Sequence, residues 1–279
     1  MRYFEARIAE NRQLGGGYFL IYLNGCAALA DSAPGQFVMV RGDWERDPLL
    51  PRAFSLLSAG PDGRAAILAK TVGRGTALLE RAQPGELLSV LGPLGSRFPA
   101  PSPEFTDLLV GGGVGIPPVY MQAETAARHG LSKRSEVLYG GRSNQDLVLL
   151  SEMEAFGISL FLTTDDGSRG RAGLVTAELE ARLDHHAAAG TAVRIMSCGP
   201  NPMLWAVARI ARERGIPCFI SVEEQMACGI GVCLGCAVPA RSRPFRYVCK
   251  DGPVFDAADI LDAGTPPANA VKVAPGCPS

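Results

Sequence analysis

Hydrophobic residues in the first hundred positions come in short runs that glycine and proline separate. The runs Tyr3–Ala9 and Tyr18–Leu23 flank three consecutive glycines, and the run Gly35–Val40 begins at a Pro-Gly pair. Short apolar runs with this punctuation are typical of antiparallel strands joined by tight turns. Residues 1–100 are therefore predicted to form a small closed antiparallel sheet, a β-barrel domain.

The pattern changes after the proline-rich stretch 99–103, which we interpret as a linker. Phe105–Val110 is a continuous apolar run that leads through a glycine turn into a helical pattern. Strand runs that stay apolar throughout, instead of alternating, are typical of parallel strands covered on both faces. Three more such runs follow, at Glu136–Tyr139, Ile158–Thr163 and Val193–Ser197. Residues 104–220 are therefore predicted to form a Rossmann-like α/β domain.

Composition and charge exclude some classes of function. The 279 residues suffice for two or three domains, and 27 basic against 28 acidic residues give a net charge of −1, so no nucleic-acid partner is expected. The first dozen residues carry charges throughout and no run has the length of a membrane span, so neither a signal peptide nor membrane insertion is expected. We expect a cytoplasmic location, where clustered cysteines are more often metal ligands than disulfides.

Four of the eight cysteines have the spacing C-x4-C-x2-C followed by one distal cysteine. They are Cys228, Cys233, Cys236 and Cys249. This is the opening spacing of a plant-type iron–sulfur ligand set, and it predicts a [2Fe–2S] cluster in a small C-terminal module, residues 221–279. A four-cysteine zinc site and two disulfides stay open as alternatives, although zinc sites favour paired C-x2-C units and disulfides need an oxidising compartment.

The residues around these cysteines fit a ligand loop. Gly229, Gly231 and Gly235 lie between the cysteines, and we expect all three to take positive φ so that backbone N–H groups approach the cluster. Tyr247 and Val248 are predicted to be a short strand that returns Cys249 to the other ligands. The short side chains of much of Gly229–Leu234 make this loop the expected contact with an electron-transfer partner.

Two stretches of the first domain carry groups that a flavin site needs. Arg52-Ala53-Phe54-Ser55 combines a cation for phosphate, an aromatic ring that can lie against a flat ring, and a hydroxyl. The stretch Ala69–Thr76 contains a Gly-x-Gly-Thr turn before a helical run, which predicts free backbone amides for a pyrophosphate at a helix N-terminus. Read singly, the first stretch also fits a half-buried strand and the second an ordinary glycine turn.

The second domain contains two candidate loops for a nicotinamide dinucleotide. Four glycines separate its first strand from the following helix: Gly111, Gly112, Gly113 and Gly115. This turn departs from the G-x-G-x-x-G pattern because Pro117 and Pro118 begin the helix, a place where proline is tolerated. Cys198-Gly199 likewise opens a helix after a strand, and the polar loop Thr163–Ser168 follows another. Cys198 also fits a plain packing role, and the aspartates of the polar loop fit a solvated turn.

The motifs RAFS, GRGT, GGGVGIPP, CGPNPM and CKDGPVFD occur in the order that is typical of one superfamily. The chain resembles the ferredoxin–NADP reductase superfamily, and more closely the family of electron-transfer subunits of NAD-linked dihydroorotate dehydrogenases. The resemblance implies an FAD-binding barrel, an NAD-binding domain and [2Fe–2S] ligation by the four cysteines. It places FAD on Arg52, Ala53, Phe54, Ser55, Ala69, Lys70, Thr71, Gly75, Thr76 and Ala77. Ala53 departs from the family, which usually has proline there, but the motif's arginine, aromatic residue and serine are present.

The resemblance also implies a reaction and a partner. An FMN-containing catalytic subunit would oxidise dihydroorotate to orotate in pyrimidine biosynthesis, and its electrons would pass singly through the cluster to FAD and as hydride to NAD⁺. The implied assembly is a heterotetramer with two copies of each subunit. No catalytic side chain is assigned, because the redox chemistry belongs to the cofactors. The corresponding subunit of a sulfide dehydrogenase, a hydrogenase or a ferredoxin–NADP transhydrogenase stays open, as do a nucleotide-binding regulatory module and a preference for NADP.

Overall fold

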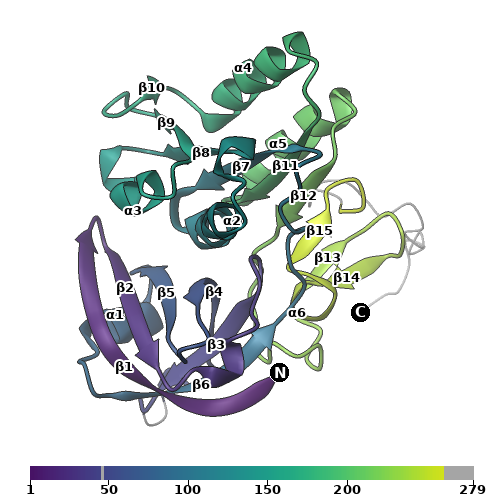
Figure 1. Ribbon diagram of the computed structural model, residues 1–279. Coiled ribbons are helices and arrows are strands. Elements are labelled where there is room, and N and C mark those ends of the chain that lie inside the picture. The colour runs from purple at the N-terminus through teal and green to yellow at the C-terminus, as the bar shows by residue number, and fades with distance from the viewer. Residues whose placement is uncertain (45–46, 261–279) are drawn as a thin grey trace.

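A computed structural model of the protein describes residues 1–44 and 47–260. Figure 1 shows a β-barrel at the bottom, an α/β domain above it, and the C-terminal segment beside both. The predicted combination of a β-barrel with a Rossmann-like domain is confirmed. Among the described residues, no helix has the length and apolar character that crossing a bilayer would require.

The barrel closes from six antiparallel strands in the order β1-β2-β5-β4-β3-β6. Most inward-facing side chains are apolar and fully buried, and a separate hydrophobic core fills the barrel. The long first strand contains the predicted run Tyr3–Ala9 and reaches the glycine turn that the sequence indicated. The elements are β1 (Arg2–Gly15), β2 (Tyr18–Asn24), η1 (Ala27–Leu29), β3 (Phe37–Gly42), β4 (Arg52–Ala59), β5 (Ala65–Lys70), α1 (Arg74–Arg81) and β6 (Leu87–Leu94).

The α/β domain has a seven-stranded sheet in the order β10-β9-β8-β7-β11-β12-β15, parallel except for the edge pair β12 and β15. Every residue of its central strand β7 is buried, as the continuous apolar run predicts. The strands are β7 (Thr106–Gly112), β8 (Ser135–Gly141), β9 (Ser159–Thr164), β10 (Arg171–Ala172), β11 (Val193–Cys198), β12 (Cys218–Ser221) and β15 (Val254–Asp256). The helices are η2 (Gly113–Gly115), α2 (Ile116–Arg128), η3 (Ser132–Arg134), η4 (Asn144–Asp146), α3 (Leu150–Glu154), α4 (Val175–Ala188) and α5 (Asn201–Glu213).

The cysteine-bearing segment is a small hairpin and helix that packs on both larger parts. It contains β13 (Ala237–Pro239), β14 (Phe245–Tyr247) and α6 (Val248–Asp251), after which the chain enters the large sheet as β15. One hydrophobic core joins barrel residues such as Met39 with sheet residues and with Cys236 and Cys249. The boundaries 1–100, 104–220 and 221–279 stay predictions, and residues 261–279 lie outside the described part.

Candidate functional site

A cleft of about 670 Å³ lies where the barrel, the α/β domain and the cysteine-bearing segment meet. The barrel contributes strands β4 and β5, the α/β domain contributes Val114 and Pro117, and residues 221–226 close one side. Of the residues expected to hold FAD, those that line the cleft are Arg52, Ala53, Phe54, Ser55, Ala69, Lys70 and Thr76. The structure therefore brings the two predicted flavin stretches together, although they are about twenty residues apart.

The three remaining flavin-site candidates lie next to the cleft residues. Gly75 packs against Arg52, since a Cβ at Gly75 would lie 2.8 Å from Arg52 Nε. Thr71 Oγ1 is buried and has no hydrogen-bond partner among the described residues, while its backbone N–H donates to Gly17. Ala77 lies within the first two turns of α1, and its amide donates to Gly73. The Thr71 hydroxyl is free to bind a ligand, and Gly75 leaves room for the Arg52 side chain, an arrangement that fits a phosphate-bearing cofactor.

The hydroxyl of Thr76 is occupied at the start of helix α1. The hydroxyl of Thr76 accepts the backbone N–H groups of Val72 and Gly73, at 3.0 and 3.1 Å, and donates to the carbonyl of Gly73. Thr76 therefore caps its own helix α1. The groups left for an anion are the first-turn backbone amides, which have no partner within a helix.

The two predicted nucleotide loops are adjacent at the carboxyl ends of neighbouring parallel strands. Gly111 on β7 is in register with Cys198 on β11. A Cβ at Gly115 would lie 2.5 Å from the Cα of Gly199, so the loops are in backbone contact. A Cβ at Gly112 would lie 2.6 Å from the sulfur of the Met203 side chain. Ligands of open α/β sheets bind at this edge, and the glycines let a dinucleotide approach the backbone there.

Cys198 itself is fully buried at the end of β11. Burial raises the pKa of its thiol well above the ordinary value, with a further contribution from Glu223. The thiol therefore stays protonated at neutral pH.

The segment Ser221–Met226 lines the cleft but was not predicted from the sequence to do so. It carries no motif, and only the fold brings it to the cleft.

The four predicted ligand cysteines lie in the cysteine-bearing segment, three in its loop and Cys249 in α6, and they form two pairs. Cys236 Sγ and Cys249 Sγ are 3.3 Å apart, and Cys228 Sγ accepts the backbone N–H of Cys233 at 3.4 Å. Burial raises the pKa of Cys228, but hydrogen bonds from the amides of Cys233 and Ile230 lower it more, to about 6. Two pairs of thiols with one already favoured as thiolate fit the four-cysteine ligation of a two-iron cluster.

Backbone groups surround the cysteine sulfurs. Among residues 1–44 and 47–260 the structure has no disulfide and no group of three or more His, Cys, Asp or Glu side chains tight enough for a metal ion. Backbone amides aim at the sulfurs, as a cluster requires: Gly231 N lies 3.1 Å from Cys249 Sγ. A Cβ at Gly231 would lie 2.9 Å from Cδ of Lys250. The loop is thus shaped for close backbone approach.

Two local expectations for the loop need correction. Gly229 and Gly231 have positive φ, as expected, but the third such residue is Leu234 at φ 60° and not Gly235. Tyr247 ends strand β14, whereas Val248 already begins helix α6, so Cys249 is delivered from a helical turn. A single left-handed leucine has no sequence signal, because glycine and asparagine are the usual residues in this conformation.

Models of two protein families match the chain. The iron–sulfur cluster binding domain of dihydroorotate dehydrogenase B matches residues 223–261, and the oxidoreductase NAD-binding domain matches residues 109–209. The first match covers all four predicted ligand cysteines. The second contains both glycine loops. The expected cluster-binding and NAD-binding domains are thereby confirmed.

Curated relatives match along nearly the whole chain. The dihydroorotate dehydrogenase B (NAD⁺) electron transfer subunit of Geobacillus kaustophilus is 38% identical over 91% of this chain and 96% of its own length. The chain belongs to this family of electron transfer subunits. A homologue of the same subunit from Aquifex aeolicus is 34% identical over 92% of this chain and 97% of its own length. The resemblance inferred from the motifs is therefore confirmed.

Solved structures of ferredoxin-linked reductases share the fold of this chain. The structure of an NADH-dependent reduced ferredoxin–NADP oxidoreductase superposes with a TM-score of 0.78 at 26% identity, over 92% of this chain and 89% of that one. A ferredoxin NADP⁺ reductase from Neisseria gonorrhoeae, with bound FAD and NADP, superposes with a TM-score of 0.65 over 77% and 92% of the two chains. At 19% identity it shows the shared fold alone.

Proposed function

We propose that this chain is the electron transfer subunit of an NAD-linked dihydroorotate dehydrogenase in pyrimidine biosynthesis. It works with a catalytic subunit that oxidises dihydroorotate, and the electrons reach NAD⁺ through a [2Fe–2S] cluster and FAD held by this chain. The observation that carries the proposal is the match to curated subunits of this enzyme along 91% of the chain, with all four ligand cysteines present.

A different set of residues would bind each of the three redox groups. Cys228, Cys233, Cys236 and Cys249 would hold the cluster. The cleft residues of β4 and β5 would hold FAD, with Arg52 at a phosphate, and Gly111–Gly115 with Cys198-Gly199 would hold NAD. When bound, FAD exchanges two electrons with a nicotinamide and one at a time with a cluster. The protein binds and orients the three groups and keeps them at the junction of its parts.

The cysteine loop also suggests where the catalytic subunit docks. Ile230, Val232 and Leu234 are 42, 74 and 51% exposed, and they alternate along the segment that contains Cys233. Exposed apolar side chains around a redox centre are typical of a surface that a partner covers. We propose that this loop contacts the catalytic subunit, that the subunit carries FMN, and that two copies of each assemble. The cytoplasmic location stays a prediction from the cysteine chemistry.

The test is anaerobic dihydroorotate-dependent NAD⁺ reduction by this chain co-expressed with a candidate catalytic subunit, with iron and flavin measured on the same sample. Activity in the complex and none in either subunit alone is the expected result. Full FAD and cluster content without this activity would show that the chain works with another partner. Electron transfer from reduced ferredoxin is then the assay to run.

A matched pair of variants tests the docking loop. Val232→Asp places a charge in the exposed loop and is expected to abolish co-purification of the two subunits. Leu174→Asp places the same charge at a residue that is 66% exposed at the start of α4, in the other large domain. It is expected to leave the complex intact. If the two variants co-purify with the catalytic subunit to the same extent, the cysteine loop is not part of the interface.

A further inference from the structure

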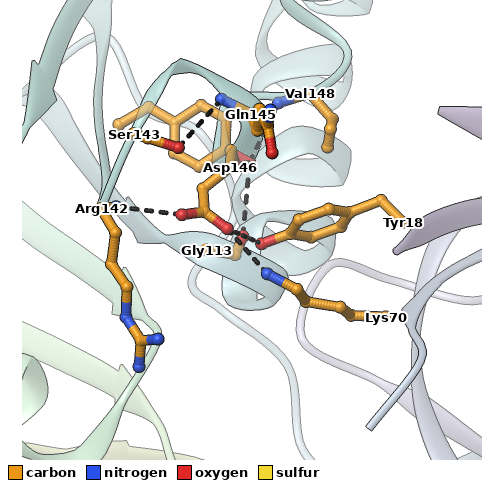
Figure 2. A network of polar contacts seen from close by, with 9 residues as sticks. Tyr18, Lys70, Gly113, Arg142, Ser143, Gln145, Asp146 and Val148 are labelled. Carbon is orange, nitrogen blue, oxygen red and sulfur yellow. Dashed lines mark hydrogen bonds and ion pairs between the residues drawn. The ribbon is translucent and has the colours of Figure 1, made fainter. Parts of the chain in front are cut away.

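A polar network around Asp146 joins the barrel to the α/β domain (Figure 2). Asp146 ends η4 in the loop after β8, whereas Tyr18 begins β2 and Lys70 ends β5. Oδ1 of Asp146 lies 2.8 Å from Lys70 Nζ and accepts the Tyr18 hydroxyl at 3.1 Å. Oδ2 accepts the backbone N–H of Arg142 at 3.1 Å. A single carboxylate therefore holds two barrel strands and its own loop.

The network continues from Asp146 to the nucleotide-binding glycine turn. The hydroxyl of Tyr139 lies 2.9 Å from the Asp146 carbonyl and 3.3 Å from the Gly113 carbonyl, and it can donate to either. It also accepts the Val148 backbone N–H at 3.4 Å. The Tyr139 side chain is fully buried, so these are its partners. The chain of contacts runs from β5, which lines the flavin cleft, to the turn expected to hold the dinucleotide.

Burial and charge make this contact stronger than an ordinary surface pair. The side chains of Lys70 and Asp146 are 32 and 14% exposed. Partial burial raises the pKa of Asp146, but hydrogen bonds from Lys70 and Tyr18 lower it more, so the pKa lies below its ordinary value and the carboxylate is charged at neutral pH. Charge-assisted hydrogen bonds of this kind are short and directional.

A second ion pair between the same two domains provides a comparison. Arg12 Nη2 lies 2.9 Å from Glu152 Oε1, and the two side chains are 40 and 39% exposed. Both residues line a separate hollow with Gly16 and Leu150 and do not line the cleft. Exposed pairs of this kind contribute little to stability. The two pairs therefore bridge the same domains but differ in burial and in distance from the cofactor site.

We propose that Asp146 is a positioning residue for hydride exchange between the flavin and nicotinamide sites. By holding Lys70 and Tyr18 on one side and Tyr139 on the other, it fixes the cleft strand β5 relative to the glycine turn Gly111–Gly115. Asp146 does not line the cleft, so it acts through the residues it holds. The inference rests on the proposed function, because it concerns the distance between the two bound groups, on which the rate depends steeply.

The first test compares Asp146→Asn with Glu152→Gln in the FAD-loaded chain. Asparagine has the same shape but one acceptor oxygen, so its NH₂ group must face either Lys70 and Tyr18 or the Arg142 N–H. We expect kcat for NADH-dependent dye reduction to fall about 10- to 100-fold in Asp146→Asn, with little change in KM for NADH or in FAD content. Glu152→Gln is expected to keep the wild-type kcat.

A second readout does not depend on catalysis and uses the chain with its cofactors bound. Tyr18→Phe removes only the hydroxyl, so a double-mutant cycle with Asp146→Asn in urea unfolding measures the coupling between the two side chains. We expect a non-zero coupling, and faster hydrogen exchange in residues 111–115 of Asp146→Asn but not of Glu152→Gln. If Asp146→Asn fails to fold, Tyr18→Phe alone decides, with a smaller fall in kcat expected.

The outcomes separate this inference from the proposed function. A wild-type chain that holds FAD but does not oxidise NADH overturns the proposed function, and the inference with it. Wild-type activity with an unchanged kcat in Asp146→Asn and in Tyr18→Phe overturns the inference alone. A fall in unfolding free energy without a change in kcat or in exchange at 111–115 shows that Asp146 only stabilises the fold, and also overturns it.

Discussion

Gly115→Ala tests the contact between the two nucleotide loops. At Gly115 the φ angle is −76°, so alanine suits the backbone and the change acts only through the added methyl group. That Cβ would lie 2.5 Å from the Cα and 2.6 Å from the N of Gly199, while ordinary contact begins at 3.4 Å. The difference, 3.4 − 2.5, means that the loops must separate by about 0.9 Å. No flexible side chain can absorb this, because the neighbouring atoms belong to the backbone.

The expected cost follows from that displacement. A misplacement of about 1 Å lowers a rate by up to about 100-fold, and forcing a methyl group into a packed site costs about 1–3 kcal/mol of folding stability. We therefore expect NADH-dependent dye reduction to fall about 10- to 100-fold. FAD and iron contents should stay at the wild-type level, because the groups expected to hold them lie on β4, β5, α1 and the cysteine loop.

Stopped-flow reduction of the bound flavin by NADH is the assay, with flavin and iron measured on each sample. Gly235→Ala is the matched control: it adds the same methyl group, and its nearest neighbour would be Cys233 Sγ at 3.7 Å, an ordinary contact. It is expected to reduce flavin at the wild-type rate. A Gly115→Ala chain that binds NADH and reduces flavin as fast as the wild type would refute the assignment of this loop pair to the dinucleotide.

Four further predictions test other parts of the chain. Cys233→Ser should lose the cluster, seen in optical spectra, and should lose electron transfer from the partner, while NADH-dependent dye reduction persists. Equal loss of partner-linked electron transfer and of dye reduction would show that the cluster has a structural role. Arg52→Ala should weaken FAD binding by about 1.5–3 kcal/mol, measured by fluorescence titration, and unchanged affinity would move the flavin phosphate elsewhere. Asp107→Asn breaks the buried ion pair between Asp107 and Arg194, whose two side chains are 2 and 9% exposed. The unfolding free energy measured in urea should fall by about 3–5 kcal/mol, whereas breaking an exposed ion pair should change it little. The folded-state pKa of Asp146 is lowered, so the carboxylate stabilises the fold above its unfolded pKa of about 3.9, and this stabilisation is lost as the pH falls through the folded-state pKa. The unfolding free energies of the wild type and of Asp146→Asn should therefore converge at acid pH. A difference between the two free energies that stays constant with pH would contradict this.

The features predicted correctly from the sequence are those that local spacing determines. The cysteine spacing indicates a cluster because its first three ligands lie within nine residues, so one loop presents them. Continuous apolar runs gave the parallel strands, and glycine and proline punctuation gave the barrel strands. In each case the signal and the structure it predicts occupy the same short stretch of chain.

The features that the sequence does not reveal depend on contacts between distant segments. Asp146 belongs to no motif in the sequence, and the role proposed for it emerges only from the contacts that Tyr18 and Lys70 make with it from the barrel. Ser221–Met226 lines the cleft only because β12 ends at it. The short strand β15 joins the large sheet although it follows the cysteine segment, which periodicity over three residues cannot indicate.

Glycines at the junctions let the three parts of the chain pack closely, which would keep the three proposed redox groups in a fixed arrangement. Gly229 of the cysteine loop packs on Met39 of the barrel, where a Cβ would lie 2.5 Å from its side chain. Gly95 of the barrel packs equally tightly on Pro253, just before the strand that enters the sheet. Glycines at these places leave room for the neighbouring side chains, and β15 anchors the cysteine segment in the same sheet that carries the proposed nucleotide loops. Electron transfer and hydride transfer both depend on short fixed distances, so under the proposed function the interdomain contacts that stabilise the fold would also hold the redox groups at those distances.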